Sequence, residues 1–462
     1  MSTPLRLLIS FVLLALLASA CSSAGDPVDE PAAESTTTTE QPAEPSTTSS
    51  TTSNVASSSD VGVDAETKVL TIGLLADLTG PFAVATSDII AGQTTYWDAL
   101  NADGGVDGWT VSYVVEDTGY NGEQQAAAYD RIRDDIVAVG LSTGSPDNST
   151  ALDEFKADRI LVMPLSWFSG WPIPRVDSGL FLELNTNYCL EAMNALDFVS
   201  QMGGQRIAVA TFAGNYGSDA AAGVKAAVDF YGMDLVFDGD SAVAPGEPPT
   251  EVIQGIVESG AEWTFLATNP SVTAELVELA TLAGYGGSFI GSYPSYDFRL
   301  LDLASADILG DRYYQSAYHV PWGTDVPGNA EMMLALRSAY PERRPSDGFI
   351  VGWNQAIAMR RVIEAAIENN AVTRRGLVRA AQSLDGIAFG GSTPDQDYVG
   401  TPNDFVQRAS AILKPNVGMY TAAGGAAQTL TTEGGTTGSI MARDFFIGEA
   451  AANHIFNRPC FE

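Results

Sequence analysis

The stretch VLTIGLLADLTGPF, residues 69–82, begins with a short apolar run and continues into a polar turn that contains Gly80 and Pro81. A helical pattern follows over residues 87–102, and the next apolar run covers residues 111–115. Apolar runs of roughly four to eight residues that alternate with helices are typical of parallel strands in a sheet that is covered on both faces. This stretch and its continuation therefore predict an α/β fold.

The same alternation continues along the chain and occurs in two series. The first series goes on with residues 123–133, 136–139, 149–155 and 160–163. The second has apolar runs at 207–212, 235–237, 263–267 and 289–290, with helices starting near 219, 251 and 272. Two such series in one chain predict two α/β lobes. A long helix is expected over residues 352–369, whereas the Gly/Thr/Ala-rich residues 421–439 are compatible with either a loop or weak strands.

The first twenty residues have the features of a secretion signal. Arg6 supplies a positive charge, and residues 7–17 form an apolar stretch that is too short to span a bilayer. Small residues at 18–20 then precede Cys21, and this run resembles a lipobox, the signal after which a bacterial lipoprotein is cleaved and diacylated. We expect a signal peptide over 1–20 and a lipidated Cys21. A plain secretory signal with an incidental cysteine is the alternative.

The segment after Cys21 has the composition of a tether. Residues 22–64 are rich in Ser, Thr, Glu, Pro and Ala and contain no Lys, Arg or aromatic residue. Such a segment cannot bury enough apolar area to offset the entropy of ordering, so residues 21–65 are expected to be a disordered spacer. We therefore expect the mature protein on the extracytoplasmic face of the cell membrane, anchored by lipid alone.

The charge balance excludes several classes of partner. The 462 residues include 23 basic and 57 acidic side chains, a formal net charge of −34. Nucleic acids and anionic lipid surfaces need a basic face, so neither is expected as a partner. His319 and His454 are the two histidines, and the acidic pairs 238/240 and 395/397 lack the spacing of an EF-hand. No metal site and no cofactor are expected.

Several short motifs occur in the order and spacing of one family. Residues 78–82 follow the first strand, residues 101–108 follow the first helix, and Asn215-Tyr216-Gly217 opens the second series. Two further motifs lie between residues 108 and 215: Glu116-Asp117 precedes a predicted helix, and Val139-Gly140 ends a predicted strand. Over residues 68–415 the sequence resembles the branched-chain amino-acid (Leu/Ile/Val-binding) family of type I periplasmic binding proteins.

The resemblance implies two Rossmann-like lobes joined by a three-strand hinge, with the ligand in the cleft between them, beyond the carboxyl ends of the strands. The chain would cross between lobes near residues 185–187, 315–319 and 406–413. The first lobe would then comprise residues 66–186 and 316–408, and the second residues 187–315 and 409–462.

The resemblance also implies a function and its partners. A protein of this family captures a small organic solute as its lobes close and delivers it to the permease and ATPase subunits of an ABC importer. It is not an enzyme, and we expect a monomer. A tethered ligand sensor without a permease would have the same sequence features. Gly140–Gly144 fits the G-x-S-x-G pattern of a hydrolase with Ser142 as nucleophile, but an oxyanion loop of the HGG type is missing from the sequence.

The ligand contacts of the family are carried over residue by residue. They are Thr143, Gly144, Ser145, Leu165, Ser166, Trp167, Asn187, Tyr216, Asn269, Tyr293 and Phe349. Other roles are open for some of them. Trp167, Phe168 and Trp171 could form a local hydrophobic plug, Tyr293 and Tyr296 could cap the lobe interface, and Ser145 could cap a helix.

The ligand is expected to differ from a branched-chain amino acid. The family commonly places an acid for the ligand's ammonium group after the strand that ends at Ile290, but Tyr293 occupies that place, and Asn187 replaces another common acid. A buried, unpaired charge is costly, whereas aromatic faces favour flat apolar groups or delocalised and quaternary cations. We expect a solute with an apolar or aromatic body and at most one anionic end.

After acylation of Cys21, Cys189 and Cys460 form an even pair in an oxidising compartment. They are either bridged, which would tie the C-terminus to the start of the second lobe, or two unpaired thiols.

Overall fold

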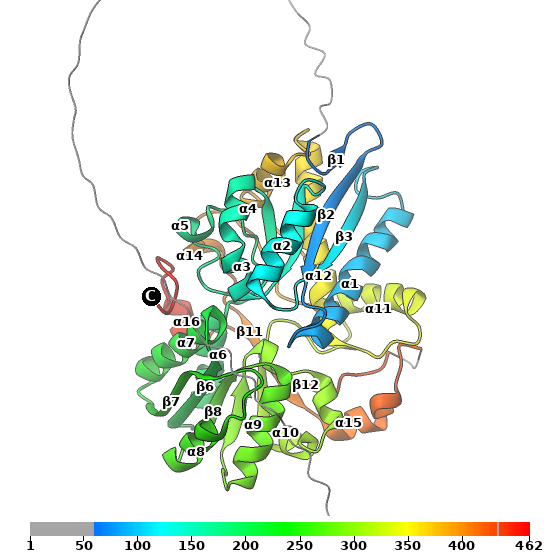
Figure 1. Cartoon of the computed structure of the whole chain (residues 1–462). Coiled ribbons are helices and arrows are strands. Elements are labelled where there is room, and N and C mark those ends of the chain that lie inside the picture. The colour runs from blue at the N-terminus through cyan, green and yellow to red at the C-terminus, as the bar shows by residue number, and fades with distance from the viewer. Residues whose placement is uncertain (1–59, 432–433) are drawn as a thin grey trace, which may run out of the picture. The chain divides into compact units, whose positions relative to one another are not determined.

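The computed structural model describes residues 60–431 and 434–462 (Figure 1). The predicted signal peptide, Cys21 and the predicted tether up to residue 59 lie outside the described residues. Regular structure begins within the segment assigned to the tether, because β1 (Val63–Asp64) pairs antiparallel with the following strand and Val63 is buried opposite Leu70. Within the described ranges, no helix combines the length and the apolar character needed to cross a bilayer.

The first sheet contains the strands of the first predicted series. They are β2 (Val69–Ala76), β3 (Thr110–Asp117), β4 (Ala138–Thr143) and β5 (Leu161–Leu165). Their order is β3-β2-β4-β5, every neighbouring pair is parallel, and β1 is added antiparallel at the start of β2. β4 and β5 are buried along their whole length, as expected for parallel strands with helices on both faces.

The first lobe's helices come from two separate parts of the chain. The N-terminal part gives α1 (Ala83–Ala102), α2 (Gly122–Ile132), α3 (Ser145–Thr150), α4 (Leu152–Asp158) and α5 (Pro174–Asp177), and the later part gives α11 (Pro327–Ala339), α12 (Asp347–Glu368), α13 (Arg374–Ala381) and α14 (Pro402–Phe405). α1 and α12 lie side by side (Figure 1). A Cβ at Gly352 would lie 1.9 Å from the carbonyl oxygen of Ile89, so glycine is required for this close helix packing.

The second sheet has seven strands. They are β6 (Arg206–Phe212), β7 (Asp234–Val243), β8 (Trp263–Ala267), β9 (Ser288–Gly291), β10 (Tyr313–Ala317), β11 (Ser410–Pro415) and β12 (Ser439–Phe446). Their order is β12-β11-β10-β9-β8-β6-β7. The strands from β10 to β7 are mutually parallel, whereas β11 runs antiparallel to both of its neighbours. The late strands β11 and β12 thus complete a sheet that is otherwise built from residues 206–317.

The second lobe's helices alternate with its strands. They are α6 (Tyr188–Gln201), α7 (Asn215–Tyr231), α8 (Thr250–Ser259), α9 (Pro270–Leu282), α10 (Ala306–Arg312), α15 (Val417–Ala422) and α16 (Glu449–Asn453), with short 3-10 turns η1 (Tyr293–Ser295), η2 (Phe298–Asp302) and η3 (Gly425–Ala427). The segment 421–439, for which the sequence left a loop or weak strands open, contains the end of α15, η3 and the first residue of β12.

The chain crosses between the two sheets three times. The first crossing is an irregular segment in which Asn185 has a left-handed backbone (φ 69°) just before α6. The second leaves from β10 and the third enters β11, its antiparallel neighbour. The crossings are hydrogen-bonded together. The Thr393 hydroxyl contacts the Asn185 side chain of the first crossing at 3.0 Å and the Tyr318 carbonyl of the second, and the Thr186 hydroxyl bonds the carbonyl of Ala409 in the third. The predicted α/β fold with two lobes is confirmed.

Candidate ligand-binding cleft

A cleft lies between the two sheets, at the carboxyl ends of their parallel strands. The first lobe contributes the start of α1 and of α12 and the loops after β3, β4 and β5, and the second lobe contributes the starts of α6 and α7, residues 293–298 and Gln315. The empty space, including the open entrance, is about 790 Å³. The cleft has the place in the fold at which open α/β sheets bind their ligands.

The centre of the cleft wall is aromatic. The Trp167 ring lies 6.0 Å from Tyr188, 5.9 Å from Tyr293 and 4.8 Å from Tyr318, measured between ring centroids. Tyr216 packs against Tyr188 at 4.6 Å. Contacts at these separations and tilted angles are favourable between aromatic rings. The wall therefore offers several ring faces and edges to an apolar or aromatic ligand.

Polar contacts fix one of these rings. The Tyr216 hydroxyl donates to the carbonyl of Thr268 at 3.0 Å and lies 2.6 Å from the Ser292 hydroxyl. Burial raises the pKa of Tyr216 well above its ordinary value, so the phenol stays protonated at neutral pH.

The loop after β4 brings Gly144 to the cleft and turns Ser145 away from it. Gly144 has φ 87°, and a Cβ there would lie 2.8 Å from the Tyr120 ring, so the backbone needs glycine. The Ser145 hydroxyl lies 2.6 Å from the Ser166 hydroxyl, which also accepts the Trp171 indole N–H at 2.9 Å. Ser145 and Ser166 are thus hydrogen-bonded behind the wall and do not line the cleft.

The predicted contacts divide into residues that line the cleft and residues that do not. Of the eleven, Thr143, Gly144, Leu165, Trp167, Tyr216 and Tyr293 line the cleft. Asn187 caps α6 and Asn269 caps α9 through their side-chain oxygens, at 3.0 Å and 2.9 Å from the accepted N–H groups of Leu190 and Val272. Phe349 is fully buried in α12.

Phe168 and Trp171 correspond to the hydrophobic plug that the sequence left open. Their rings pack against each other at 5.1 Å, and Trp171 also stacks on Phe181 at 4.5 Å. Neither residue lines the cleft, although they lie within four residues of Trp167 in the sequence. The third member of the group, Trp167, lies in the cleft wall.

Several lining residues were not predicted from the sequence. They are Phe82, Ala85, Thr86, Ile89, Tyr120, Tyr188, Pro294, Tyr296, Asp297, Phe298, Gln315, Asp347 and Gly348. Most belong to helix starts and to the loop that follows β9. Tyr188 had a usable signal, because it directly follows Asn187, and an Asn before an apolar periodic run indicates a helix N-terminus, which in this fold lies at the cleft.

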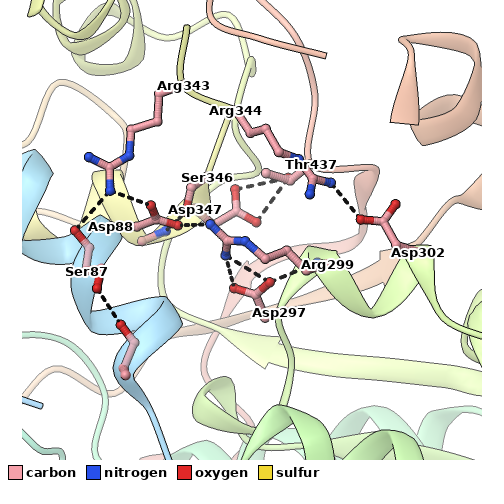
Figure 2. Close-up of polar contacts among 12 residues, drawn as sticks. Ser87, Asp88, Asp297, Arg299, Asp302, Arg343, Arg344, Ser346, Asp347 and Thr437 are labelled. Atoms are coloured by element: carbon pink, nitrogen blue, oxygen red, sulfur yellow. Dashed lines mark hydrogen bonds and ion pairs between the residues drawn. The ribbon is translucent and has the colours of Figure 1, made fainter. Parts of the chain in front are cut away.

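Carboxylates and arginines border the cleft on one side (Figure 2). Arg299 bonds Asp88 of α1 at 2.5 Å and Asp297 at 2.9 Å, and Arg343 lies 3.3 Å from Asp88. Beside them, Arg344 bonds Asp302 of η2 at 2.9 Å. Asp88, Arg343 and Arg344 come from the first lobe and the other residues from the second, so the pairs Asp88–Arg299 and Asp302–Arg344 bridge the two lobes.

Glu191 supplies a carboxyl group beneath Tyr293, near the place where the sequence lacks an acid. It lies in the first turn of α6 and accepts the backbone N–H of Tyr293 through Oε1, while Oε2 is buried without a hydrogen-bond partner among the described residues. Burial raises the pKa of Glu191 well above its ordinary value. Since Glu191 is buried and does not line the cleft, this acid lies behind the wall.

The geometry does not favour the hydrolase reading of Ser142. This residue lies inside β4, is fully buried, and its hydroxyl accepts the side-chain N–H of Gln125 at 3.0 Å. His319 bonds the carbonyl of Val320 through Nδ1 and packs edge-on against Tyr293, and no hydrogen bond between described residues joins a histidine to Ser142.

The acidic pair 238/240 has a basic partner. Asp238 and Asp240 both pair with Lys225, at 3.1 Å and 3.0 Å. Among the described residues, the group whose ligand atoms lie close enough for a metal is Cys189, His454 and Cys460. Its two sulfurs are joined in a disulfide with a Cα–Cα distance of 6.3 Å, so they are not free to act as thiolate ligands.

Comparisons with known proteins identify the family. The family model described as "Periplasmic binding protein" matches residues 69–413. No curated protein sequence matches significantly. Among solved structures, the chain is similar to a fatty acid ABC transporter substrate-binding protein from Thermomonospora curvata, with 23% identity and a TM-score of 0.76 over 86% of this chain and 96% of that one.

Two further structures illustrate the range of similar proteins. One is a branched-chain amino acid ABC transporter protein from Thermus thermophilus with bound valine (18% identity, TM-score 0.67, 83% and 97% covered). The other is a solute-binding protein of an ABC transporter from R. palustris in complex with 4-hydroxybenzoate. It has 14% identity and a TM-score of 0.64, over 82% of this chain and 98% of that one. These likenesses concern the fold. Because the family model spans well over half of the sequence, the chain belongs to the periplasmic binding proteins, which bind solutes for ABC transporters and are not enzymes.

Proposed function

We propose that the protein is the lipid-anchored solute-binding component of an ABC importer and that it captures a small organic solute with an apolar or aromatic body. Family membership supports the importer role, and the sequence before Cys21 supports the anchor. The aromatic wall around Trp167 is the observation that carries the solute class. The similar structures named for a fatty acid, valine and 4-hydroxybenzoate leave the solute of this chain open.

The experiment that tests the proposal is native mass spectrometry of the purified, tag-free protein, because a cleft between two lobes can retain its solute through purification. We expect an adduct with the mass of a small organic molecule that is lost on denaturation. Calorimetry with leucine, isoleucine and valine completes the test. Micromolar or tighter binding of any of these amino acids would contradict the proposed solute class and restore the ordinary specificity of the family.

Substitutions in the aromatic wall test whether the adduct is bound in the cleft. At a hundredfold excess over Kd, a ligand stabilises its binding protein by about 2.7 kcal/mol. Trp167→Leu should remove most of this stabilisation because it deletes the ring that contacts Tyr188, Tyr293 and Tyr318. Phe168→Leu, one residue further on, is the matched control, since Phe168 does not line the cleft. Equal retention of the adduct by both variants would place the solute elsewhere.

The anchor and the permease need separate tests. Cys21→Ser should move the protein from the membrane fraction to the soluble fraction, because diacylation requires the sulfur, and unchanged membrane retention would exclude this anchor. Delivery to a permease is tested by solute uptake into cells in which the protein has been deleted. We expect uptake of the retained solute to fall on deletion and to return when the protein is restored.

A further inference from the structure

The position of Asp347 indicates the charge of the solute. Asp347 is the first residue of α12, lines the cleft and is partly exposed to it. A carboxylate in the first turn of a long helix is stabilised in its ionised form by the helix dipole. Asp347 therefore presents a negative charge to the space in which the solute binds.

Asp347 forms no ion pair with a basic side chain of the described residues, in contrast to its neighbours. Asp88 pairs with Arg299 and Arg343, and Asp297 pairs with Arg299. Asp347 accepts the backbone N–H of Trp322 at 2.9 Å and the hydroxyl of Thr437 at 3.1 Å, as Figure 2 shows for Thr437.

No ion pair or hydrogen bond joins Asp347 to Lys, Arg or His in the part of the chain that the structure describes. Asp88 and Asp297 thus share the two guanidinium groups of Arg299 and Arg343, whereas the carboxylate of Asp347 lines the cleft without an ion pair among the described residues.

His319 is the basic group that acts on Asp347, but it does not form a salt bridge with it. Burial raises the pKa of Asp347 above its ordinary value, and nearby His319 and the hydrogen bonds from Trp322 and Thr437 oppose this rise without cancelling it. The His319 ring is held 2.8 Å from the carbonyl of Val320 through Nδ1. Its edge-on contact with Tyr293 then fixes it beside the aromatic wall rather than on the carboxylate.

The rest of the lining also disfavours an anion. The lining includes Asp297 in addition to Asp347, and it contains no Lys, Arg or His among the described residues. The hydroxyls of Ser145 and Ser166, which the family resemblance implied as ligand contacts, are hydrogen-bonded to each other behind the wall. An anionic group in the cleft would face the carboxylate of Asp347 and would find no basic side chain in the lining, so burying it there would be costly.

The aromatic residues next to Asp347 favour a cation. Burial raises the pKa of Tyr293 and of Tyr296 well above the ordinary value of a phenol, and the negative charges of Asp297 and Asp347 raise both further. Both tyrosines line the cleft. A carboxylate beside aromatic faces is the arrangement that attracts an ammonium group or another organic cation.

We infer that the solute is an organic cation with an aromatic or apolar body and that Asp347 is its counter-ion, an inference that rests on the proposed solute-binding function. It narrows the solute class from a molecule with at most one anionic end to one that carries a positive charge. Asp347 is then a specificity-determining residue for this cleft.

The test compares three probes that share one aromatic body and differ in charge. Tryptamine is a cation near neutral pH, tryptophol is neutral and indole-3-acetate is an anion. By calorimetry on the full-length protein, we expect tryptamine to bind at least about tenfold more tightly than the other two. Asp347→Asn should lower the affinity for tryptamine at least about tenfold and change that for tryptophol no more than about twofold. Asp307→Asn, an exposed acid on α10, is the control for a change in net charge and should leave all three affinities unchanged.

Each other outcome has a defined meaning. A uniform loss of affinity for all probes in Asp347→Asn would assign Asp347 a structural role, and tighter binding of indole-3-acetate would assign the cleft to anions. Both results overturn the inference, as does the failure of all three probes to bind, and none of them affects the adduct that tests the proposed function. An adduct without a basic group would likewise overturn the inference while supporting solute binding itself. Thr437→Val keeps the charge of Asp347 and removes one hydrogen bond, so it should retain the preference for tryptamine.

Discussion

The two lobes are joined by different interactions at the chain crossings and at the charged edge of the cleft. At the crossings, uncharged hydrogen bonds connect Asn185 with Thr393 and Thr186 with Ala409. At the cleft edge, the bridges are ion pairs such as Asp88–Arg299. Interactions of the first kind respond weakly to salt, whereas exposed ion pairs are screened by it. We therefore expect the lobes to separate at the charged edge and to stay joined at the crossings.

The C-terminal residues strengthen the crossing side. Cys460 is bonded to Cys189 of α6, and its N–H donates to the Ser169 hydroxyl of the first lobe at 2.8 Å. Ser169 in turn bonds Asp219 of α7 through both its N–H and its hydroxyl. A short C-terminal segment thus links the first lobe to the first two helices of the second.

The largest effect is expected from breaking this link. The two cysteines are separated by 271 residues, and closing so long a loop lowers the entropy of the unfolded chain by an amount equivalent to about 5 kcal/mol in the simple loop model. The double variant Cys189→Ser/Cys460→Ser should lose free energy of unfolding of this order, measured by guanidinium denaturation, with little change in solute affinity. Two reactive thiols in the denatured, unreduced wild-type protein would show that the bridge does not form.

A second test of the crossing side uses pH. Burial raises the pKa of Asp219 from 3.8 to about 7. The hydrogen bonds from Ser169 act in the opposite direction but are outweighed. The unfolded chain releases this proton at lower pH than the folded protein does, so the contribution of Asp219 is greatest below pH 3.8 and is lost as pH rises towards 7. Over that range the stability of the wild type relative to Asp219→Asn should fall by roughly 1.4 kcal/mol per pH unit.

The measurement is the free energy of unfolding of both proteins across that range. Asp147 and Asp177 also have pKa values raised by burial, to about 7 and about 6, so the absolute slope of the wild type contains several contributions. The difference between wild type and variant isolates Asp219. A difference that stays constant with pH would mean that Asp219 is ionised in the folded protein throughout.

The contrast between the two regions also shows what the sequence could predict. The lobes follow from local patterns, because an apolar run such as Val69–Ala76 is long enough to specify a buried strand by itself. Thr143 and Trp167 were carried over from the family resemblance, and they lie at the last residue of β4 and two residues after β5. The aligned strands bring their carboxyl ends to one edge, so residues after a strand end are predictable site candidates.

The charged edge could not be predicted in this way. Asp88 is in α1, Arg299 is in a 3-10 turn after β9, and Arg343 precedes α12, so these residues meet through the packing of distant segments. In the sequence each is a single charge in a chain with many charges. Asn187 and Asn269, two positions carried over from the family, cap helices in the structure, and an Asn at a helix start is a local signal for that capping role.

At the charged edge, the larger effect is expected from Asp88. Its side chain is 3% exposed and its carboxylate bonds an arginine of each lobe. Asp88→Asn removes the interlobe pair without altering a lining residue, so fewer molecules should adopt the closed arrangement and the affinity for the retained solute should fall roughly fivefold, or about 1 kcal/mol. Asp98→Asn, an exposed acid on the same helix, is the control. Equal affinities of the two variants in calorimetry would remove this pair from the closing interactions.

The smallest effect is expected from Asp302, because its ion pair is the more exposed one. Asp302 bonds Arg344 of the first lobe at 2.9 Å, with side chains 29% and 24% exposed, and also accepts the Tyr420 hydroxyl at 2.8 Å. Solvent weakens the attraction between such charges, so Asp302→Asn should reduce solute affinity no more than about twofold at low salt. At about 1 M salt the screening length falls to about 3 Å, and the difference from wild type should vanish. Calorimetry at low and high salt measures both values. A loss of affinity that persists at high salt would indicate that Asp302 acts through its hydrogen bond with Tyr420. The interactions at the charged edge would then be as insensitive to salt as the hydrogen bonds at the crossings.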